Sequence, residues 1–255
     1  MVKTSTSARS PLSPTLWPPD AFVWWQSLLF VVVVLIATYV PVVIIAAFLI
    51  AFGVISPAQF RTTSLTAPLL LAQTLAYLFA FGVVAVGLPT IARRPLAALG
   101  LRAPRARDVG WGLAGAVVMV VAAIATGALE DAIFHLKPDE VQVHVLRATQ
   151  GAMIVGFAFL ACVAAPFFEE VVFRGFLFNA ILRYVPAWAA VMLSAVLFGF
   201  AHFQPGNAGA ILPLAAGGAV LATVYYRTGS LIASMITHAT FNAFTVVAVV
   251  VFHQT

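Results

Sequence analysis

Long apolar segments alternate with short polar connections along most of this chain. Uncharged or nearly uncharged runs cover residues 21–55, 67–91, 110–128, 149–168, 187–203, 208–226 and 230–252. Because about 20 apolar residues in a helix span a bilayer, each run predicts a membrane-spanning helix. The first run contains Pro41 and predicts one tilted or kinked helix, since neither half would cross comfortably alone.

The fourth run extends beyond its apolar part. Residues from Glu169 to Tyr184 follow it without a Gly-Pro break and predict a continuation of the same helix. The fold class is therefore all-α, a polytopic membrane protein with about seven or eight transmembrane helices. We expect a flexible, proline-rich tail at 1–20, N-terminal transmembrane helices at 21–148 and a C-terminal helical core at 149–255. The run after the tail is too long for the core of a signal peptide and predicts an uncleaved anchor.

Composition agrees with a lipid environment. Apolar residues make up 63% of the 255 positions and charged residues 8%, whereas soluble domains carry about 25% charged residues. The chain therefore lacks the polar surface that water requires, and the lipid bilayer is its first expected partner. The net charge of +5 comes from few, scattered basic residues, so we expect no nucleic-acid partner. Cys162 stands alone, which excludes an intrachain disulfide and a cysteine-based metal site.

The charges in the connections predict an orientation. Residues 92–109 are rich in arginine, whereas residues 129–148 are rich in carboxylates. With seven spans and the N-terminus in the cytoplasm, the basic residues on the outer side are only Arg61, Lys137 and Arg147. This distribution agrees with the excess of Lys and Arg in cytoplasmic loops of membrane proteins.

Ionisable side chains are rare inside the predicted helices, and those that occur lie in the C-terminal half. Of eight carboxylates only Glu169 and Glu170 lie in apolar sequence, and of five histidines only His202 and His238 do. An ionised side chain at membrane depth costs about 2.5–3.5 kcal/mol on insertion scales, so such residues indicate function.

The spacing of these residues predicts that they meet. If residues 149–184 and 187–203 form a hairpin that turns at Val185-Pro186, Glu169 and His202 both lie about 17 residues from the turn. At 1.5 Å per residue, this distance is about 25 Å for each of them, which places them at the same depth.

The last predicted helix adds two more polar residues at that depth. It begins near Ser230, on the side of the hairpin turn, and Asn242 then lies about 18–20 Å from that side. His238 and Asn242 are i,i+4 neighbours and share a helix face. We therefore expect two carboxylates, two imidazoles and an amide to converge on one pocket inside the bilayer.

Each of these residues also has a structural alternative. Glu170 and Arg174 are i,i+4 neighbours and predict a buried ion pair. A histidine or asparagine in a membrane helix often only hydrogen-bonds to another helix, and Phe198 is of a type that packs in the core.

The chemistry that such a pocket favours is the activation of water. A carboxylate that is shielded from bulk water can act as a general base, and a neighbouring imidazole can relay the proton. A second imidazole and an amide can stabilise a developing oxyanion. Nucleophilic catalysis is less favoured, because Ser194 lies two turns from His202 and Cys162 has no evident activating partner.

Three short motifs resemble the signature of a known family. Glu169 to Arg174 reads EEVVFR and matches EExxxR, Phe198 to His202 matches FxxxH, and His238 to Asn242 matches HxxxN. In this order they resemble the CPBP intramembrane proteases, which comprise the type II CAAX prenyl endopeptidases and the bacteriocin-processing or immunity relatives of the ABI family. Residues 1–145 resemble that family only in being hydrophobic.

This resemblance implies a catalytic core at 149–255 in a bacterial-type plasma membrane. It implies an intramembrane endopeptidase that hydrolyses a peptide bond in a membrane-associated peptide or a lipidated protein, with CAAX-type prenylated substrates as one class. The roles that it implies are water activation by Glu169 and His202, an oxyanion hole formed by His238 and Asn242, and support from Glu170, Arg174 and Phe198.

Other readings of the same residues stay open. We expect no cofactor, although zinc held by Glu169, His202 and His238 is the alternative. A non-catalytic scaffold or bacteriocin-immunity protein would function without Glu169. A proton-coupled transporter would also use buried Glu and His, but transporters usually contain internal repeats, which this sequence lacks.

The side on which the pocket opens is predicted differently by two arguments. The depth and the charge distribution together place the pocket nearer the outer leaflet. The resemblance implies the opposite, because prenylated CAAX substrates are presented from the cytosol. One more span within 21–55, or a separate span at 169–184, would remove the conflict, and we expect an inward-facing site.

Overall fold

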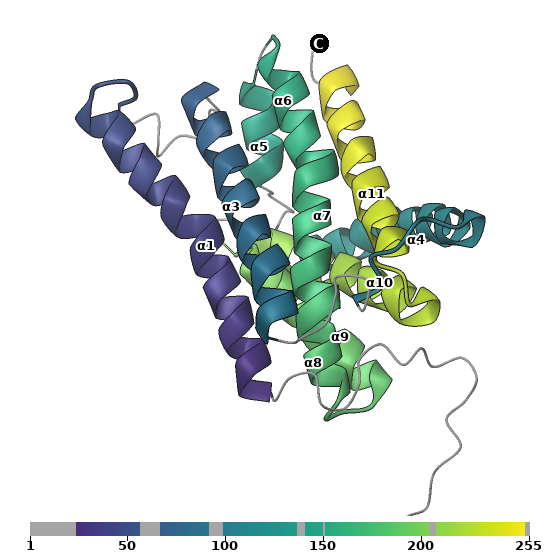
Figure 1. Ribbon diagram of the computed structural model, residues 1–255. Coiled ribbons are helices and arrows are strands. Elements are labelled where there is room, and N and C mark those ends of the chain that lie inside the picture. Colours follow the sequence, from purple (N-terminus) through teal and green to yellow (C-terminus); the bar gives the residue numbers. More distant parts are fainter. Residues whose placement is uncertain are drawn as a thin grey trace, which may run out of the picture.

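The computed structural model describes residues 24–56, 67–91, 99–136, 141–149, 151–203 and 208–252, and these form helices and their connections (Figure 1). No strand occurs within these ranges, and the predicted all-α class is confirmed. The predicted tail at 1–20 lies outside the described residues, as do Arg61 and Lys137.

Four α-helices lie in the described part of the N-terminal half. The long ones are α1 (Trp24–Ala51), α3 (Ala67–Ile91) and α4 (Ala106–Phe134), and the short α5 (Val141–Ala148) follows them. The helix α1 continues through Pro41, as predicted for a single span. The short α5 lies within residues 129–148, for which a connection was predicted, and this prediction is corrected.

The C-terminal half begins with one continuous rod of helical segments. These segments are α6 (Met153–Phe159), η2 (Leu160–Ala164), α7 (Ala165–Glu170), η3 (Val171–Phe178) and α8 (Asn179–Leu182). The segments η2 and η3 are π-helical, a form that is rare and that often occurs at functional sites. The remaining long helices are α9 (Ala187–Ala201), α10 (Ile211–Thr228) and α11 (Leu231–Phe252).

Six helices in the described ranges are long and apolar enough to cross a membrane. They are α1, α3, α4, the α6–α8 rod, α10 and α11. The predicted helix at 187–203 is present as α9, but it has only 15 residues. At 1.5 Å per residue it is roughly 22 Å long, shorter than a hydrocarbon core of about 30 Å. The described ranges thus contain six helices of spanning length and, in α9, one shorter apolar helix of 10–17 residues, where the sequence predicts seven or eight spans.

The start of α4 explains why this helix is longer than the predicted run 110–128. The backbone N–H of Arg105 donates a hydrogen bond to Asp108 Oδ2 at 2.9 Å, which caps the first turn. The Arg102 guanidinium binds both oxygens of the same carboxylate, at 2.6 and 3.0 Å. Asp108 is therefore a buried, paired residue of the helix, whereas the sequence places it in a connection.

The helices pack in two groups that meet at the rod. The helix α1 packs against α3, while α4 packs against α10 and α11, and α9 packs along α10. Figure 1 shows the rod between α3 and α11. A Cβ atom at Gly218 would lie 3.1 Å from Ala195 Cα, so this glycine allows α9 and α10 to approach closely.

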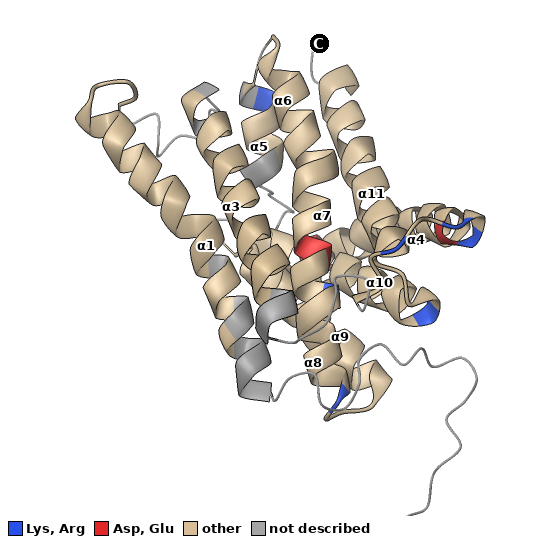
Figure 2. Cartoon of the chain, in the orientation of Figure 1, with Lys and Arg blue, Asp and Glu red and all other residues tan. Residues whose placement is uncertain are grey.

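Most charged side chains in the described ranges lie at the ends of helices. In Figure 2 the basic residues lie mainly at helix ends, whereas the carboxylate pair at the end of α7 lies near the middle of the bundle. The outer faces of α1, α3 and α4 expose large apolar side chains, as a lipid-facing surface requires. The predicted inward opening of the pocket stays a prediction.

Candidate active site

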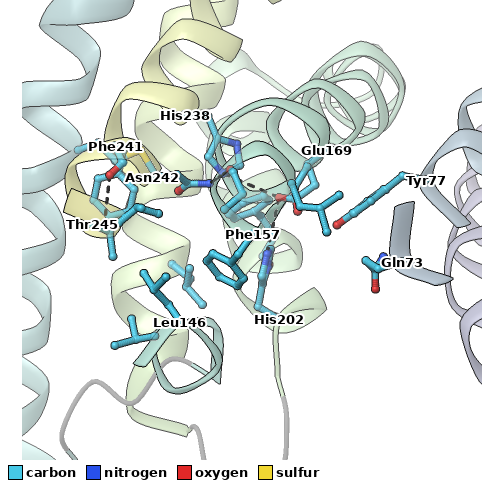
Figure 3. A pocket seen from close by; sticks show the side chains of 18 residues that line it. Gln73, Tyr77, Leu146, Phe157, Glu169, His202, His238, Phe241, Asn242 and Thr245 are labelled. Atoms are coloured by element: carbon cyan, nitrogen blue, oxygen red, sulfur yellow. Dashed lines mark hydrogen bonds and ion pairs between the residues drawn. The ribbon is translucent and has the colours of Figure 1, made fainter. Parts of the chain in front are cut away.

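A pocket of about 280 Å³ lies in the middle of the bundle, where the rod meets α3, α9 and α11 (Figure 3). Its wall is mostly apolar. The polar side chains that line it are Gln73, Tyr77, Glu169, His202, His238, Asn242 and Thr245. The four residues for which a direct role in the reaction is predicted therefore all reach this one pocket.

Glu169 is the centre of the polar cluster. His202 Nε2 lies 3.6 Å from its Oε2 atom, and His238 Nε2 lies 3.9 Å from the same oxygen. These are ion-pair distances, longer than a direct hydrogen bond. Figure 3 shows both rings directed at this carboxylate from different helices. The hairpin of the rod and α9 thus brings Glu169 and His202 together, as their equal distances from the turn predict.

The ring of His202 is oriented by its own helix. Its Nδ1 atom lies 2.8 Å from the Phe198 carbonyl oxygen, and because a carbonyl only accepts, Nδ1 carries the hydrogen and donates. The rings of Phe198 and His202 also pack, with centroids 4.6 Å apart. The FxxxH spacing therefore has a physical basis: Phe198 supports the ring and fixes which nitrogen faces Glu169.

The ring of His238 is oriented by the second carboxylate. Its Nδ1 atom donates to Glu170 Oε1 at 3.0 Å, which leaves Nε2 facing Glu169. With Nδ1 protonated in this way, Nε2 donates a hydrogen bond only when the ring carries both protons. The adjacent glutamates consequently differ in function: Glu170 holds an imidazole, and Glu169 faces the pocket.

Glu170 is a fully buried carboxylate that is saturated with donors. Arg174 Nη1 donates to its Oε1 at 3.1 Å, and the Ser234 hydroxyl donates to its Oε2. The side chains of Glu170 and Arg174 are both 0% exposed. The predicted i,i+4 ion pair is thus present, and it belongs to a network that ends at His238.

Arg174 is itself held by other elements. Its Nη2 donates to the Gly218 carbonyl of α10 at 3.1 Å, and its Cζ lies 4.5 Å from the ring centroid of Phe198. The cation therefore ties the rod to α9 and α10 while it neutralises Glu170.

Asn242 faces the pocket from α11, one turn beyond His238. Its side-chain Nδ2 donates to the Ala161 carbonyl at 2.7 Å. Ala161 lies in the π-helical segment η2, where the backbone hydrogen-bond pattern changes from i+4 to i+5. An amide nitrogen has two hydrogens, so Asn242 keeps one donor after this bond is made.

Comparison with known families tests the resemblance that the motifs carry. Residues 151–244 match the family model described as type II CAAX prenyl endopeptidase Rce1-like. The match confirms the predicted resemblance to the CPBP family. No curated protein and no solved structure matched the chain. The predicted site residues all lie in this Rce1-like region: Glu169, Glu170, Arg174, Phe198, His202, His238 and Asn242.

The Rce1-like region supports a CAAX-type intramembrane protease as the general class of function. Together with the six apolar helices it also supports a multi-pass integral membrane protein that acts on membrane-associated peptides. The individual roles of the side chains remain to be proposed from the geometry.

Sequence reasoning missed four polar residues at or near the site, which are Ser234, Gln73, Tyr77 and Thr245. Ser234 lies four residues before His238 on the same face of α11. This spacing could have predicted that its hydroxyl reaches Glu170, the carboxylate that His238 also contacts. Gln73 and Tyr77 line the pocket from α3, outside the Rce1-like region. They too are i,i+4 neighbours in an apolar helix, a pattern like that of His238 and Asn242.

Zinc held by Glu169, His202 and His238 is the alternative to metal-free chemistry. Within the described ranges, no group of three or more His, Cys, Asp and Glu side chains is placed so that it could hold a metal ion. A reaction without a metal stays a prediction.

Proposed function

We propose that this chain is an intramembrane endopeptidase in which Glu169 activates a water molecule against a peptide bond. The observation that carries the proposal is the convergence of two imidazole Nε2 atoms on one carboxylate oxygen in a pocket inside an apolar bundle. A water molecule beside Glu169 Oε2 would lie between two groups. Glu169 would accept its proton, and His202 would orient it.

In the proposed reaction, Glu169 takes a proton from the water as its oxygen attacks the carbonyl carbon. The new C–O bond forms while the carbonyl electrons move onto oxygen. When the tetrahedral intermediate collapses, the C–N bond breaks and the proton held by Glu169 or His202 passes to the leaving amine. Water is consumed, and a carboxylic acid and an amine are released.

The negative charge on the intermediate needs donors that are already in place. We assign this role to the remaining N–H of Asn242 and to the Nε2–H that His238 carries once its ring holds both protons, because both residues face the pocket and are held by bonds to Ala161 and Glu170. Donors that are fixed before the reaction do not have to reorganise when the charge develops, which is why they stabilise it efficiently. Glu170, Arg174 and Phe198 then support the reaction by holding His238 and His202.

Hydrolysis by the purified protein is the direct test. We expect endoproteolytic cleavage of a farnesylated peptide with a C-terminal CAAX sequence, or of members of a peptide library, detected as fragments by mass spectrometry. If no peptide is cleaved, the protease proposal fails and a scaffold or immunity protein becomes the better explanation.

Metal dependence is tested in the same assay. We expect the cleavage rate to remain unchanged in the presence of a strong zinc chelator, since Glu169 and His202 suffice for water activation in the proposed reaction. A rate that is lost with the chelator and restored by added zinc would show instead that a metal is required.

Asn242→Ala is expected to lower kcat by about 10²- to 10³-fold, as is usual for the loss of one oxyanion donor. Asn242→Asp is the matched variant, since it preserves the shape but replaces the donor by a carboxylate. It should be at least as inactive as the alanine variant. A loss below about tenfold in both variants, with unchanged thermal stability in detergent, would remove Asn242 from the oxyanion hole.

A further inference from the structure

A peptide that enters this pocket faces a shortage of hydrogen-bond partners. Hydrolysis requires an extended segment, whose main-chain N–H and C=O groups no longer bond to each other as in a helix. Inside a bundle in the bilayer, unpaired main-chain groups are costly, so the protein has to supply partners. This requirement rests on the proposed endopeptidase function.

Most polar side chains of the pocket already have a bond within the protein. These bonds are His202 to Phe198, His238 to Glu170, Asn242 to Ala161 and Thr245 to Phe241. Gln73 and Tyr77 differ, because neither forms a side-chain hydrogen bond with any part of the chain that the structure describes. Two polar groups therefore face the pocket with their hydrogen-bonding capacity unused.

The position of these two groups fits a peptide chain. They lie one helical turn apart on α3 and share a face. In Figure 3 the Tyr77 hydroxyl points toward Glu169, on the side away from His238 and Asn242, and Gln73 lies beside it. The Tyr77 ring packs on the ring of Phe168, the residue that precedes Glu169, with centroids 5.4 Å apart.

We propose that Gln73 and Tyr77 form a main-chain binding strip for the substrate, opposite the oxyanion donors. The Gln73 amide both accepts and donates, so it can pair with an N–H and a C=O of the extended peptide. The Tyr77 hydroxyl can donate to a second carbonyl of the peptide, at a distance of one turn of α3 from the groups that Gln73 binds. The N-terminal half of the chain would thus bind the substrate that the Rce1-like region cleaves.

The strip is tested first by binding, without hydrolysis. In a Glu169→Gln background, the Kd of a fluorescently labelled farnesylated CAAX peptide is measured by anisotropy. We expect Gln73→Leu and Tyr77→Phe each to raise it about tenfold, as the loss of a hydrogen bond in a water-excluding site implies. Thr74→Val is the matched control on the same helix, since Thr74 does not line the pocket, and it should stay within about twofold.

A second experiment separates direct bonding from a change of pocket shape. Single peptide N–H groups are replaced by ester oxygens, which removes one donor at a time. One ester should weaken binding to the protein that retains Gln73 but have little further effect in Gln73→Leu, because the two changes remove the same bond. If every ester weakens binding equally in both proteins, Gln73 accepts no main-chain N–H and the strip as proposed is wrong.

The outcomes distinguish this proposal from the endopeptidase itself. Cleavage with unchanged KM and kcat in both α3 variants would overturn the strip and leave the protease intact. A peptide that binds through Gln73 and Tyr77 but is not cleaved by the unchanged protein would support the strip and overturn the protease. If the peptide shows no binding, both proposals fail for this class of substrate.

Discussion

Glu169→Gln is expected to lower kcat for peptide hydrolysis by about 10³- to 10⁴-fold while the protein remains folded. The substitution keeps the size of the side chain and removes the group that accepts the proton from water, which is the full contribution of a general base. Glu169 makes none of the hydrogen bonds that hold Glu170, so the bonds of Arg174 and Ser234 to Glu170 remain after its replacement. The measurement is the single-turnover rate together with the melting temperature in detergent.

Two further variants sharpen this result. His202→Ala should be similarly inactive. Combining it with Glu169→Gln should lower kcat no further than the less active of the two single variants, because the two residues act as a unit. Asp131→Asn neutralises an exposed carboxylate at the end of α4 and should leave the rate unchanged. Full activity of Glu169→Gln would end the proposed mechanism, and it is also what a scaffold or immunity protein predicts.

The part of the site that could be predicted from sequence is the part where polar residues interrupt apolar helices. Glu169, His202 and His238 stand out because the bilayer makes ionisable side chains costly, and their depth follows from counting residues from a turn. In a hairpin of two antiparallel helices with a constant rise, Glu169 and His202 lie at the same depth because they are equally far from the turn. The EExxxR and FxxxH spacings add i,i+4 relations that the structure shows as contacts, and the HxxxN spacing places His238 and Asn242 in the lining of one pocket.

The contribution of α3 could not be predicted in the same way. Apolar residues occur on every face of this helix, so its hydrophobic pattern does not tell which face turns toward the core. Its rotation depends on packing with α1 and with the rod, which are long-range contacts. Only the polar pair Gln73 and Tyr77 marks the inner face, and their role becomes visible once the pocket is known.

Backbone irregularities are a second limit of sequence analysis. The π-helical segments η2 and η3 lie on both sides of Glu169 and Glu170, in a stretch that reads as an ordinary apolar helix. A π-helical turn shifts the phase of the following residues, and no residue type enforces it. The helix α9 ends at Ala201, and the next residue, His202, has φ −96° and ψ 1°, outside the helical region.

Arg174→Ala is expected to cost more stability than any other single change discussed for this chain. Arg174 is the only cation that contacts Glu170 among the described residues, and both side chains are 0% exposed. Without it, a buried carboxylate keeps only His238 and Ser234 as donors and loses its neutralising charge. Breaking a buried pair in this way typically costs about 3–5 kcal/mol.

In a chain of this size such a loss corresponds to a fall in melting temperature on the order of 10 °C. Thermal unfolding in detergent should therefore rank Arg174→Ala well below Glu169→Ala. The matched control is the double variant Glu170→Gln with Arg174→Met, which removes both charges. It should recover much of the stability, because no unpaired charge remains in the bundle. Equal melting temperatures for Arg174→Ala and Glu169→Ala would show that the Glu170–Arg174 pair does not stabilise the fold, and its role would then be confined to orienting His238.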